Sequence, residues 1–299
     1  MSMERMMTGK TKVGAEKRAE TPKRLRIRAF AQPTGGAGKT TAVVNLAEVI
    51  NATPGRKAMA IDIDPESATL SHHRGLEPVR IHIMNRRGSE VDLKRYQELF
   101  DTLIAGPTRG YTDFLIDAGS SGFRGLMTFL VSQGVVGLLE VGGFEVEIHY
   151  LLPANGRKQE AINDLPKVLT AFPQQSVVLW INPVLEEEFL IDGQDFVETE
   201  LYRRHRERFS AIIRLPHLDT SFRHTFTLLL QHGLTYAEVL AASEEVLRAM
   251  VAAVRGGQLP AQKVCTHLPP GLDDSLALSR VSALQQWMAQ AIQRAEGVL

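Results

Sequence analysis

The feature that most constrains this chain is the stretch from residue 30 to residue 50, FAQPTGGAGKTTAVVNLAEVI. A strand-like apolar segment leads into a group of glycines, which is followed by a lysine, two threonines and a helical pattern. A glycine-rich loop between a strand and a helix brings backbone N–H groups and the positive end of the helix dipole to one point. This context predicts a phosphate-binding loop in an α/β protein.

The residue types in this loop each suit contact with a phosphate. Glycines permit positive φ angles and a close approach of the backbone to an anion. Lys39 is placed to reach the β- and γ-phosphate oxygens, and the Thr40 hydroxyl is placed to ligate Mg²⁺. The predicted nucleotide-binding residues of the loop are Gly35, Gly36, Ala37, Gly38, Lys39, Thr40 and Thr41.

Short apolar or β-branched segments recur along the chain, and helical patterns lie between most of them. This alternation predicts a doubly wound, mostly parallel sheet of the P-loop NTPase type, followed by C-terminal helices. The predicted strands are Leu25–Ala31, Lys57–Ile63, Val79–Met84, Tyr111–Ile116, Phe144–Leu152, Ser176–Ile181 and Ala211–Leu215. The predicted helices are Thr40–Asn51, Asp92–Leu103, Arg124–Leu139, Gln159–Ala171, Asp195–Phe209, Ser221–His232, Tyr236–Val254 and Ser275–Ala295.

Composition narrows the class of protein further. The 34 basic and 34 acidic residues balance, so no whole-protein basic field points to nucleic acid. A single cysteine, Cys265, excludes a disulfide framework and fits a reducing compartment, so we expect a cytoplasmic protein. No apolar run approaches the ~20 residues of a membrane span. Residues 1–23 are polar and lysine-rich and are expected to form a disordered basic tail, either contacting DNA non-specifically or having no role.

Two acidic segments follow predicted strands. IDIDPES places Asp62 and Asp64 on one side of the second strand, at the carboxyl end where open α/β sheets bind ligands. DFLIDAGSSG matches a Walker B strand closed by Asp117, which would hold Mg²⁺ through water, with Gly119 as a γ-phosphate contact. One carboxylate would serve the ion and another the nucleophile. Asp113, before this strand, is expected to be a surface cap.

The loop departs from the usual P-loop, because Pro33 stands where the first glycine is expected. It resembles the deviant Walker A loop of the ParA/MinD ATPases, whose pattern is lysine, two glycines, any residue, glycine, lysine and Ser/Thr. Thr34 occupies the position of that first, signature lysine. In the family this lysine crosses a dimer interface to the partner's phosphates, and a threonine is too short and uncharged to do so.

The resemblance implies roles for individual residues. Asp64 stands where the attacking water is oriented, and Asp62 stands closer to the metal. Asn182 in VVLWINP is implied as an adenine contact, and Pro216 in AIIRLP as a wall beside the base. The implied metal residues are therefore Thr40, Asp62 and Asp117.

The missing signature lysine leaves open which cation balances charge on the transferred phosphate. Arg124, just after the segment that must sense the γ-phosphate, is the favoured replacement. Arg86 and Arg87, in the loop after the third strand, are the alternatives. The predicted catalytic residues are then Asp64, Lys39 and Arg124.

From residue 119 onward, the order of landmarks looks like that of the TraL-type nucleotide-binding proteins of plasmid conjugation and mobilisation, a branch of the ParA/MinD superfamily. The resemblance covers about residues 26–240 and implies a P-loop ATPase domain over residues 24–299, including a C-terminal helical extension. It also implies an ATP- and Mg²⁺-dependent homodimer working with a plasmid transfer or partition protein. Two alternatives stay open: a non-hydrolysing nucleotide-binding module that recruits partners, and an ATP-dependent ligase of the dethiobiotin synthetase type. The DxDP segment argues against a ligase, which keeps its pocket open for a carboxylate substrate.

Overall fold

The computed structural model describes residues 24–67, 69–85, 87–88, 90–183, 188–217 and residue 290. The basic tail predicted for residues 1–23 lies outside this part of the chain. The three helices predicted after Pro216 also lie outside it, apart from the single residue Gln290.

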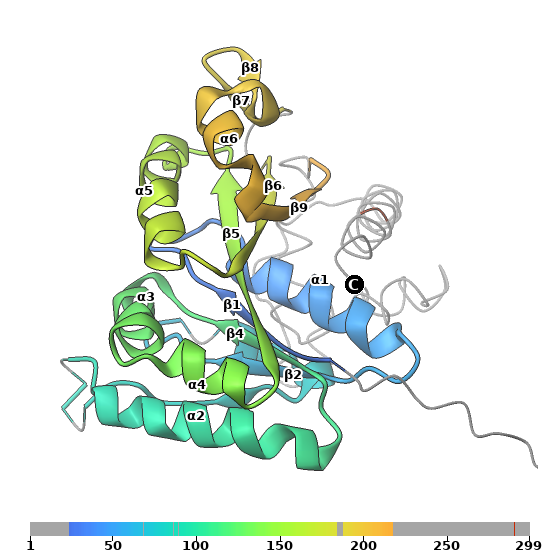
Figure 1. Ribbon diagram of the computed structural model, residues 1–299, viewed down its shortest axis with the longest axis vertical. Helices are drawn as coiled ribbons and strands as arrows, with labels where there is room; N and C mark the ends of the chain where they lie inside the picture. The colour runs from blue at the N-terminus through green and yellow to red at the C-terminus, as the bar shows by residue number, and fades with distance from the viewer. Residues whose placement is uncertain are drawn as a thin grey trace, which may run out of the picture.

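Seven parallel strands form one sheet in the order β3-β2-β4-β1-β5-β6-β9 (Figure 1). Each overlaps one of the seven predicted strands, so the predicted doubly wound α/β fold is confirmed. The strands are β1 (Leu25–Phe30), β2 (Ala58–Asp62), β3 (Val79–Arg80), β4 (Asp113–Asp117), β5 (Phe144–Pro153), β6 (Ser176–Asn182) and β9 (Phe209–Arg214). Because β1 lies between β4 and β5, the loops after these three strands meet at the carboxyl edge of the sheet.

Helices cover both faces of the sheet (Figure 1). Helix α1 packs on one face, and helices α2 to α5 pack on the other. The helices are α1 (Lys39–Ala52), α2 (Tyr96–Ala105), α3 (Ser120–Met127), α4 (Val135–Val141), α5 (Lys158–Ala171) and α6 (Glu200–His205). The 3₁₀ segments are η1 (Thr69–His72), η2 (Arg74–Leu76), η3 (Leu93–Arg95), η4 (Gly106–Arg109), η6 (Phe196–Glu198) and η7 (Arg206–Arg208).

The helix predicted over Arg124–Leu139 is broken in the structure. It starts earlier, as α3, continues as a π-helical turn, η5 (Thr128–Ser132), and restarts as α4 after Gly134. Gly134 has φ 66°, a left-handed conformation that a regular helix cannot contain. Within the described residues no single helix is long and apolar enough to span a membrane, and these two halves, bent by 60°, meet that test only as a pair.

The helix predicted over Asp195–Phe209 is wrong in its first part. Strand β7 (Leu190–Ile191) pairs antiparallel with β8 (Gln194–Asp195), and only then do η6 and α6 follow. The turn between the two strands places Asp192 at φ 49° and Gly193 at φ 77°. Two consecutive left-handed residues favour a tight hairpin turn, and Asp and Gly are the residue types that tolerate it.

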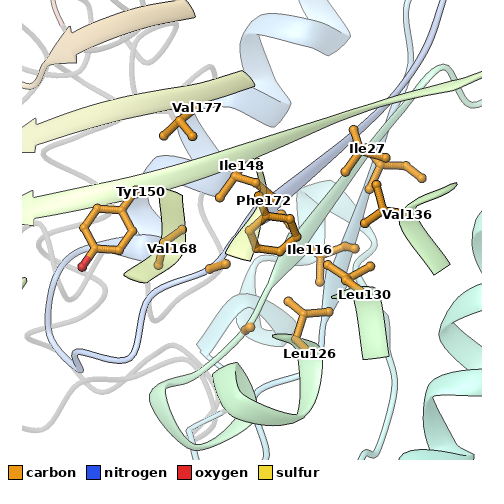
Figure 2. Packing of buried hydrophobic residues seen from close by; sticks show 14 of the residues in the cluster. Ile27, Ile116, Leu126, Leu130, Val136, Ile148, Tyr150, Val168, Phe172 and Val177 are labelled. Carbon is orange, nitrogen blue, oxygen red and sulfur yellow. The ribbon is translucent and has the colours of Figure 1, made fainter. Parts of the chain in front are cut away.

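The apolar side chains of each strand alternate between the two faces. On the face covered by α2 to α5, Ile27, Ile116 and Ile148 from three neighbouring strands lie near Phe172, which follows α5 (Figure 2). All four side chains are at most 1% exposed. Burying each of them contributes about 1.5–3 kcal/mol, so this cluster holds the sheet in the shape that carries its carboxyl-edge loops.

A cluster of charges is buried on the opposite face, under α1. Arg28, in the centre of β1, is fully buried, forms an ion pair with Asp113, and has Nε 3.1 Å from Glu147 Oε2. Arg56 also pairs with Asp113, and the Thr112 hydroxyl donates to it at 2.7 Å. The expectation that Asp113 is a surface cap is wrong, because β4 begins inside the molecule. Burial would raise the pKa of Asp113, but the Arg28 charge and these hydrogen bonds hold it below its ordinary value.

We predict that Asp113→Ala lowers the free energy of unfolding by about 3–5 kcal/mol, because it leaves the buried Arg28 guanidinium without its main partner. Glu200→Ala is the matched control, since Glu200 pairs with Arg204 on the surface at 2.5 Å with both side chains more than half exposed. We expect that control to lose less than about 1 kcal/mol. Urea unfolding of the two variants decides the matter, and equal losses would contradict a structural role for the buried cluster.

Candidate nucleotide-binding site

The predicted phosphate loop connects the end of β1 to the start of α1, at the carboxyl edge of the sheet. Gly36 and Gly38 adopt φ angles of 69° and 91°, which favour glycine. A Cβ on Gly38 would lie 2.4 Å from Asn182 Nδ2, so this position also needs glycine for space. The Gly38 carbonyl accepts the first helical hydrogen bond, from Ala42 N at 3.0 Å. The loop therefore ends where the helix dipole begins.

A cavity of about 360 Å³ opens over this loop. Its walls come from three segments that follow β1, β2 and β4. The lining residues are Gly35, Gly36, Ala37, Gly38, Lys39, Thr40, Thr41, Asp64, Glu66, Ser67, Thr69, Asp117, Gly119 and Ser120. The fold thus gathers all seven predicted loop residues and three of the predicted acidic-segment residues around one space, whose volume suits a small ligand. We call it the phosphate cavity.

The Lys39 side chain extends back along the phosphate loop toward Thr34. It is almost buried, and Nζ donates a 3.0 Å hydrogen bond to the Thr34 carbonyl. Burial lowers the pKa of Lys39, and the charges of Asp117 and Asp64 oppose that effect. An ammonium held in this way gains an ionic partner when an anion enters the cavity.

Thr40 and Asp117 form the cavity's pair of hard oxygen donors. The Thr40 hydroxyl donates to Asp117 Oδ2 at 2.6 Å. Burial raises the pKa of Asp117 to about 6, although the Thr40 hydrogen bond and the Lys39 charge lower it. Hydroxyl and carboxylate oxygens are the ligands that Mg²⁺ prefers, and a cation beside them would compensate the buried negative charge. The donor set therefore fits a magnesium ion.

Asp62 lies behind the phosphate cavity instead of lining it. Its side chain is fully buried, and Oδ1 accepts from Asp64 N at 3.0 Å. Oδ2 accepts from the backbone N and the hydroxyl of Ser71 at 2.9 and 2.7 Å. These three hydrogen bonds fix the segment after β2, and the role of Asp62 near the metal stays a prediction.

Asp64 and Gly119 lie next to each other in the lining of the phosphate cavity. Asp64 accepts hydrogen bonds from Glu66 N at 2.9 Å and from the Ser67 hydroxyl. A Cβ on Gly119 would lie 2.1 Å from Asp64 Oδ1, within the carboxylate. Glycine at 119 is thus what allows the segments after β2 and β4 to approach, so the predicted water-orienting residue sits beside the predicted γ-phosphate contact.

Asn182 contacts the phosphate loop, and Pro216 lines a second cavity. The Asn182 amide donates to the Ala37 carbonyl at 2.9 Å, so it braces the phosphate loop. Its neighbours Ile181 and Pro183, together with Pro216, line a larger cavity of about 950 Å³. Of the two predicted base contacts, Pro216 lines this cavity and Asn182 lies between two residues that do, and the contact of both with adenine stays a prediction.

Neither of the described arginines predicted to replace the signature lysine, Arg87 and Arg124, lines the phosphate cavity. Arg124 is exposed and lines a separate cavity of about 470 Å³, which shares only Ser120 with the phosphate cavity. Arg87 is exposed, and its backbone N–H donates a hydrogen bond to Asn85 Oδ1. Arg86 lies outside the described residues.

A different arginine, Arg157, approaches the phosphate loop and was missed by the sequence reasoning. A Cβ on Gly35 would lie 3.6 Å from Arg157 Nη1 and 3.6 Å from Ser120 Oγ. Arg157 follows β5 in the segment PANGRK, and β5 is hydrogen-bonded to β1. The signal that would have found it is adjacency in the sheet, which places the loop after β5 next to the loop after β1.

Fold and site together define a class of nucleotide-binding protein, and comparison with known proteins gives the same class. Residues 29–256 match the model of the CobQ/CobB/MinD/ParA nucleotide-binding domain, and the chain belongs to this family. More specifically, it is similar to two Escherichia coli proteins named TraL. One is 29% identical over 223 residues, covering 73% of this chain and 88% of the relative. The other is 30% identical over 221 residues, covering 72% and 87%.

Solved structures of ParA and MinD proteins also match the chain. A ParA family ATPase from Chlorobium tepidum has 14% identity and a TM-score of 0.43, covering 70% of this chain and 90% of its own. A MinC:MinD cell division complex from Aquifex aeolicus has 14% identity and a TM-score of 0.43, covering 88% and 96%.

We predict that Asp117→Asn stabilises the ligand-free protein at pH 8. The pKa of Asp117 rises from the ordinary 3.8 to about 6 on folding, so the wild-type protein loses stability as the pH rises through this window. Asparagine carries no charge and still accepts from Thr40, so the variant should gain about 1–3 kcal/mol at pH 8. Near pH 4 the wild-type carboxyl is neutral in the folded protein, and the gain should vanish.

Thermal unfolding of both proteins at the two pH values measures this difference. Asp101→Asn, on the exposed side of α2, is the control and should change stability little at either pH. An Asp117→Asn protein that is less stable than wild type at pH 8 would contradict the account of a buried, uncompensated charge.

Proposed function

We propose that this chain binds ATP with Mg²⁺ and hydrolyses it slowly, and that it acts as an ATP-dependent homodimer in plasmid transfer or partition. One observation carries the proposal. A single cavity gathers the glycine loop, Lys39, the Thr40–Asp117 pair and Asp64, which are the parts that phosphoryl transfer to water requires.

In this proposal the loop amides and Lys39 bind the phosphates. Thr40 and Asp117 hold Mg²⁺, which would neutralise phosphate charge when bound. Their 2.6 Å hydrogen bond and the raised pKa of Asp117 support this assignment. The hydrogen bonds of Asp62 support a positioning role for it, since they hold Asp64 in place.

Asp64 is the residue we propose for orienting the attacking water. Its carboxylate lines the cavity next to Gly119. The base would occupy the larger cavity bordered by Pro216, with Asn182 at the junction between base and phosphates. Hydrolysis then needs only proton acceptance or orientation by Asp64 and stabilisation of charge on the transferred phosphate.

The rate is expected to be low because of Thr34. Its side chain is fully buried and its Oγ1 has no hydrogen-bond partner among the described residues, so no charge stands at this position of the loop. The alternative function, a nucleotide-binding module that does not hydrolyse, rests on the same observation. The two differ in turnover and not in the binding site.

The setting in plasmid biology is proposed from relatives. Similarity to the E. coli proteins named TraL, over most of both chains, supports a role alongside a plasmid transfer protein. Contact of the basic tail with DNA remains a proposal for residues outside the described part of the chain.

The test uses two variants, one expected to lose nucleotide binding and the other expected to lose only hydrolysis. Lys39→Ala should abolish binding of MgATP, measured by calorimetric titration, because the cavity loses the only cation that lines it among the described residues. Asp64→Ala should bind MgATP with near wild-type affinity, lose phosphate release, and accumulate the ATP-bound dimer in sedimentation velocity.

Lys167→Ala and Glu98→Ala serve as controls, because both residues lie on exposed helix surfaces away from the cavity. They should behave as wild type. Unchanged affinity of Lys39→Ala would refute the site. Turnover absent from wild type, together with intact binding, would favour the non-hydrolysing module.

A further inference from the structure

The side chains that line the phosphate cavity carry too little positive charge to balance a triphosphate. Three carboxylates, from Asp64, Glu66 and Asp117, line it, against one ammonium, from Lys39, among the described residues. An ATP molecule brings up to four negative charges, and one Mg²⁺ compensates only two of them. A second protein cation near the loop would make the terminal phosphate easier to hold.

Arg157 is placed to supply that cation. A Cβ built on Gly35 would lie 3.6 Å from Arg157 Nη1 and equally far from the Ser120 hydroxyl oxygen. Ser120 lines the phosphate cavity together with Gly119 and Asp64, so Arg157, which is not itself in the lining, approaches the loop beside the residues where the terminal phosphate would lie.

The loop that carries Arg157 is tied to the phosphate loop. Asn155 Nδ2 donates to the Gly36 carbonyl at 3.4 Å, and Asn155 Oδ1 accepts from Arg157 N at 2.9 Å. Asn155 thus links the loop after β5 to the loop after β1 and fixes the position of the Arg157 backbone. Arg157 is exposed, and no acidic side chain of the described residues forms an ion pair with it within 4.0 Å. It is therefore available to an entering anion.

We propose that Arg157 binds the terminal phosphate of ATP from the same subunit and makes the site prefer ATP over ADP. This inference rests on the proposed function and adds a residue to it. A guanidinium presents a planar fork of donors that matches phosphate oxygens, which an ammonium cannot reproduce. Asn155 is a positioning residue in this scheme.

The test is calorimetric titration of the full chain with MgADP and with a non-hydrolysable MgATP analogue. Arg157→Ala should lower the affinity for the ATP analogue at least about tenfold, equivalent to about 1.4 kcal/mol of binding free energy, and lower the affinity for MgADP less than about threefold. Arg157→Lys should recover part of the loss because it keeps the charge but lacks the fork. Asn155→Ala should shift the ATP preference in the same direction by a smaller factor.

Two arginine controls sharpen the result. Arg109→Ala, at an exposed position before β4 and so at the opposite edge of the sheet, should match wild type. Arg204→Ala, on the exposed surface of α6 where Arg204 pairs with Glu200, should also keep the ATP preference. Arg157 is exposed, so its variant should fold, and a thermal unfolding curve that coincides with wild type verifies this.

The possible results distinguish a failure of the Arg157 proposal from a failure of the proposed nucleotide-binding function. Wild-type binding of both nucleotides with an unchanged ATP preference in Arg157→Ala would overturn the inference and leave the proposed function standing. Equal weakening of both nucleotides would also overturn it, because the arginine would then not distinguish the terminal phosphate. No binding by wild type would refute the proposed function, and the inference with it.

Discussion

The site depends on the position of β1 between β4 and β5 in an all-parallel sheet. This order places the loops that follow β1, β4 and β5 at one edge, and β2, paired with β4, adds a fourth. Each loop contributes a different chemistry: backbone donors and Lys39, then Asp117 and Gly119, then Arg157, and Asp64. No single segment could bind a nucleotide, and the pairing of the strands is what brings the segments together.

Charges are buried in two places under α1, with different consequences. In the first, Arg28 in the centre of β1 forms ion pairs with Asp113 and Glu147 of the neighbouring strands. At the carboxyl end Asp117 has Thr40 and Lys39 nearby, yet its pKa is still raised to about 6. The first cluster pairs a buried cation with carboxylates of the protein itself, whereas at the second a bound cation would compensate the charge of Asp117. This difference is the physical reason to place function at the carboxyl edge.

Much of this arrangement could be predicted from the sequence, because it follows from local patterns. The seven strands appear as short apolar runs, and the phosphate loop appears as glycines between a strand and a helix. Features set by distant contacts could not be read in this way. Asp113 resembles a surface cap until Arg28, 85 residues away along the chain, is seen to pair with it. The hydrogen bonds from Ser71 to Asp62, nine residues apart, likewise have no signature in the local pattern. Arg157 needed the strand order before it could be placed.

Hydrogen exchange with and without MgATP tests the central claim most directly, because it reads every loop of the carboxyl edge at once. The account predicts slowed amide exchange in residues 35–41, 64–67 and 117–120, where the cavity-lining backbone would be held by ligand. It predicts a smaller effect in residues 155–157 and unchanged exchange in α2, which lies on the other face. Protection that leaves residues 35–41 unaffected, in a protein shown to be saturated with MgATP, would contradict a nucleotide site built on this loop.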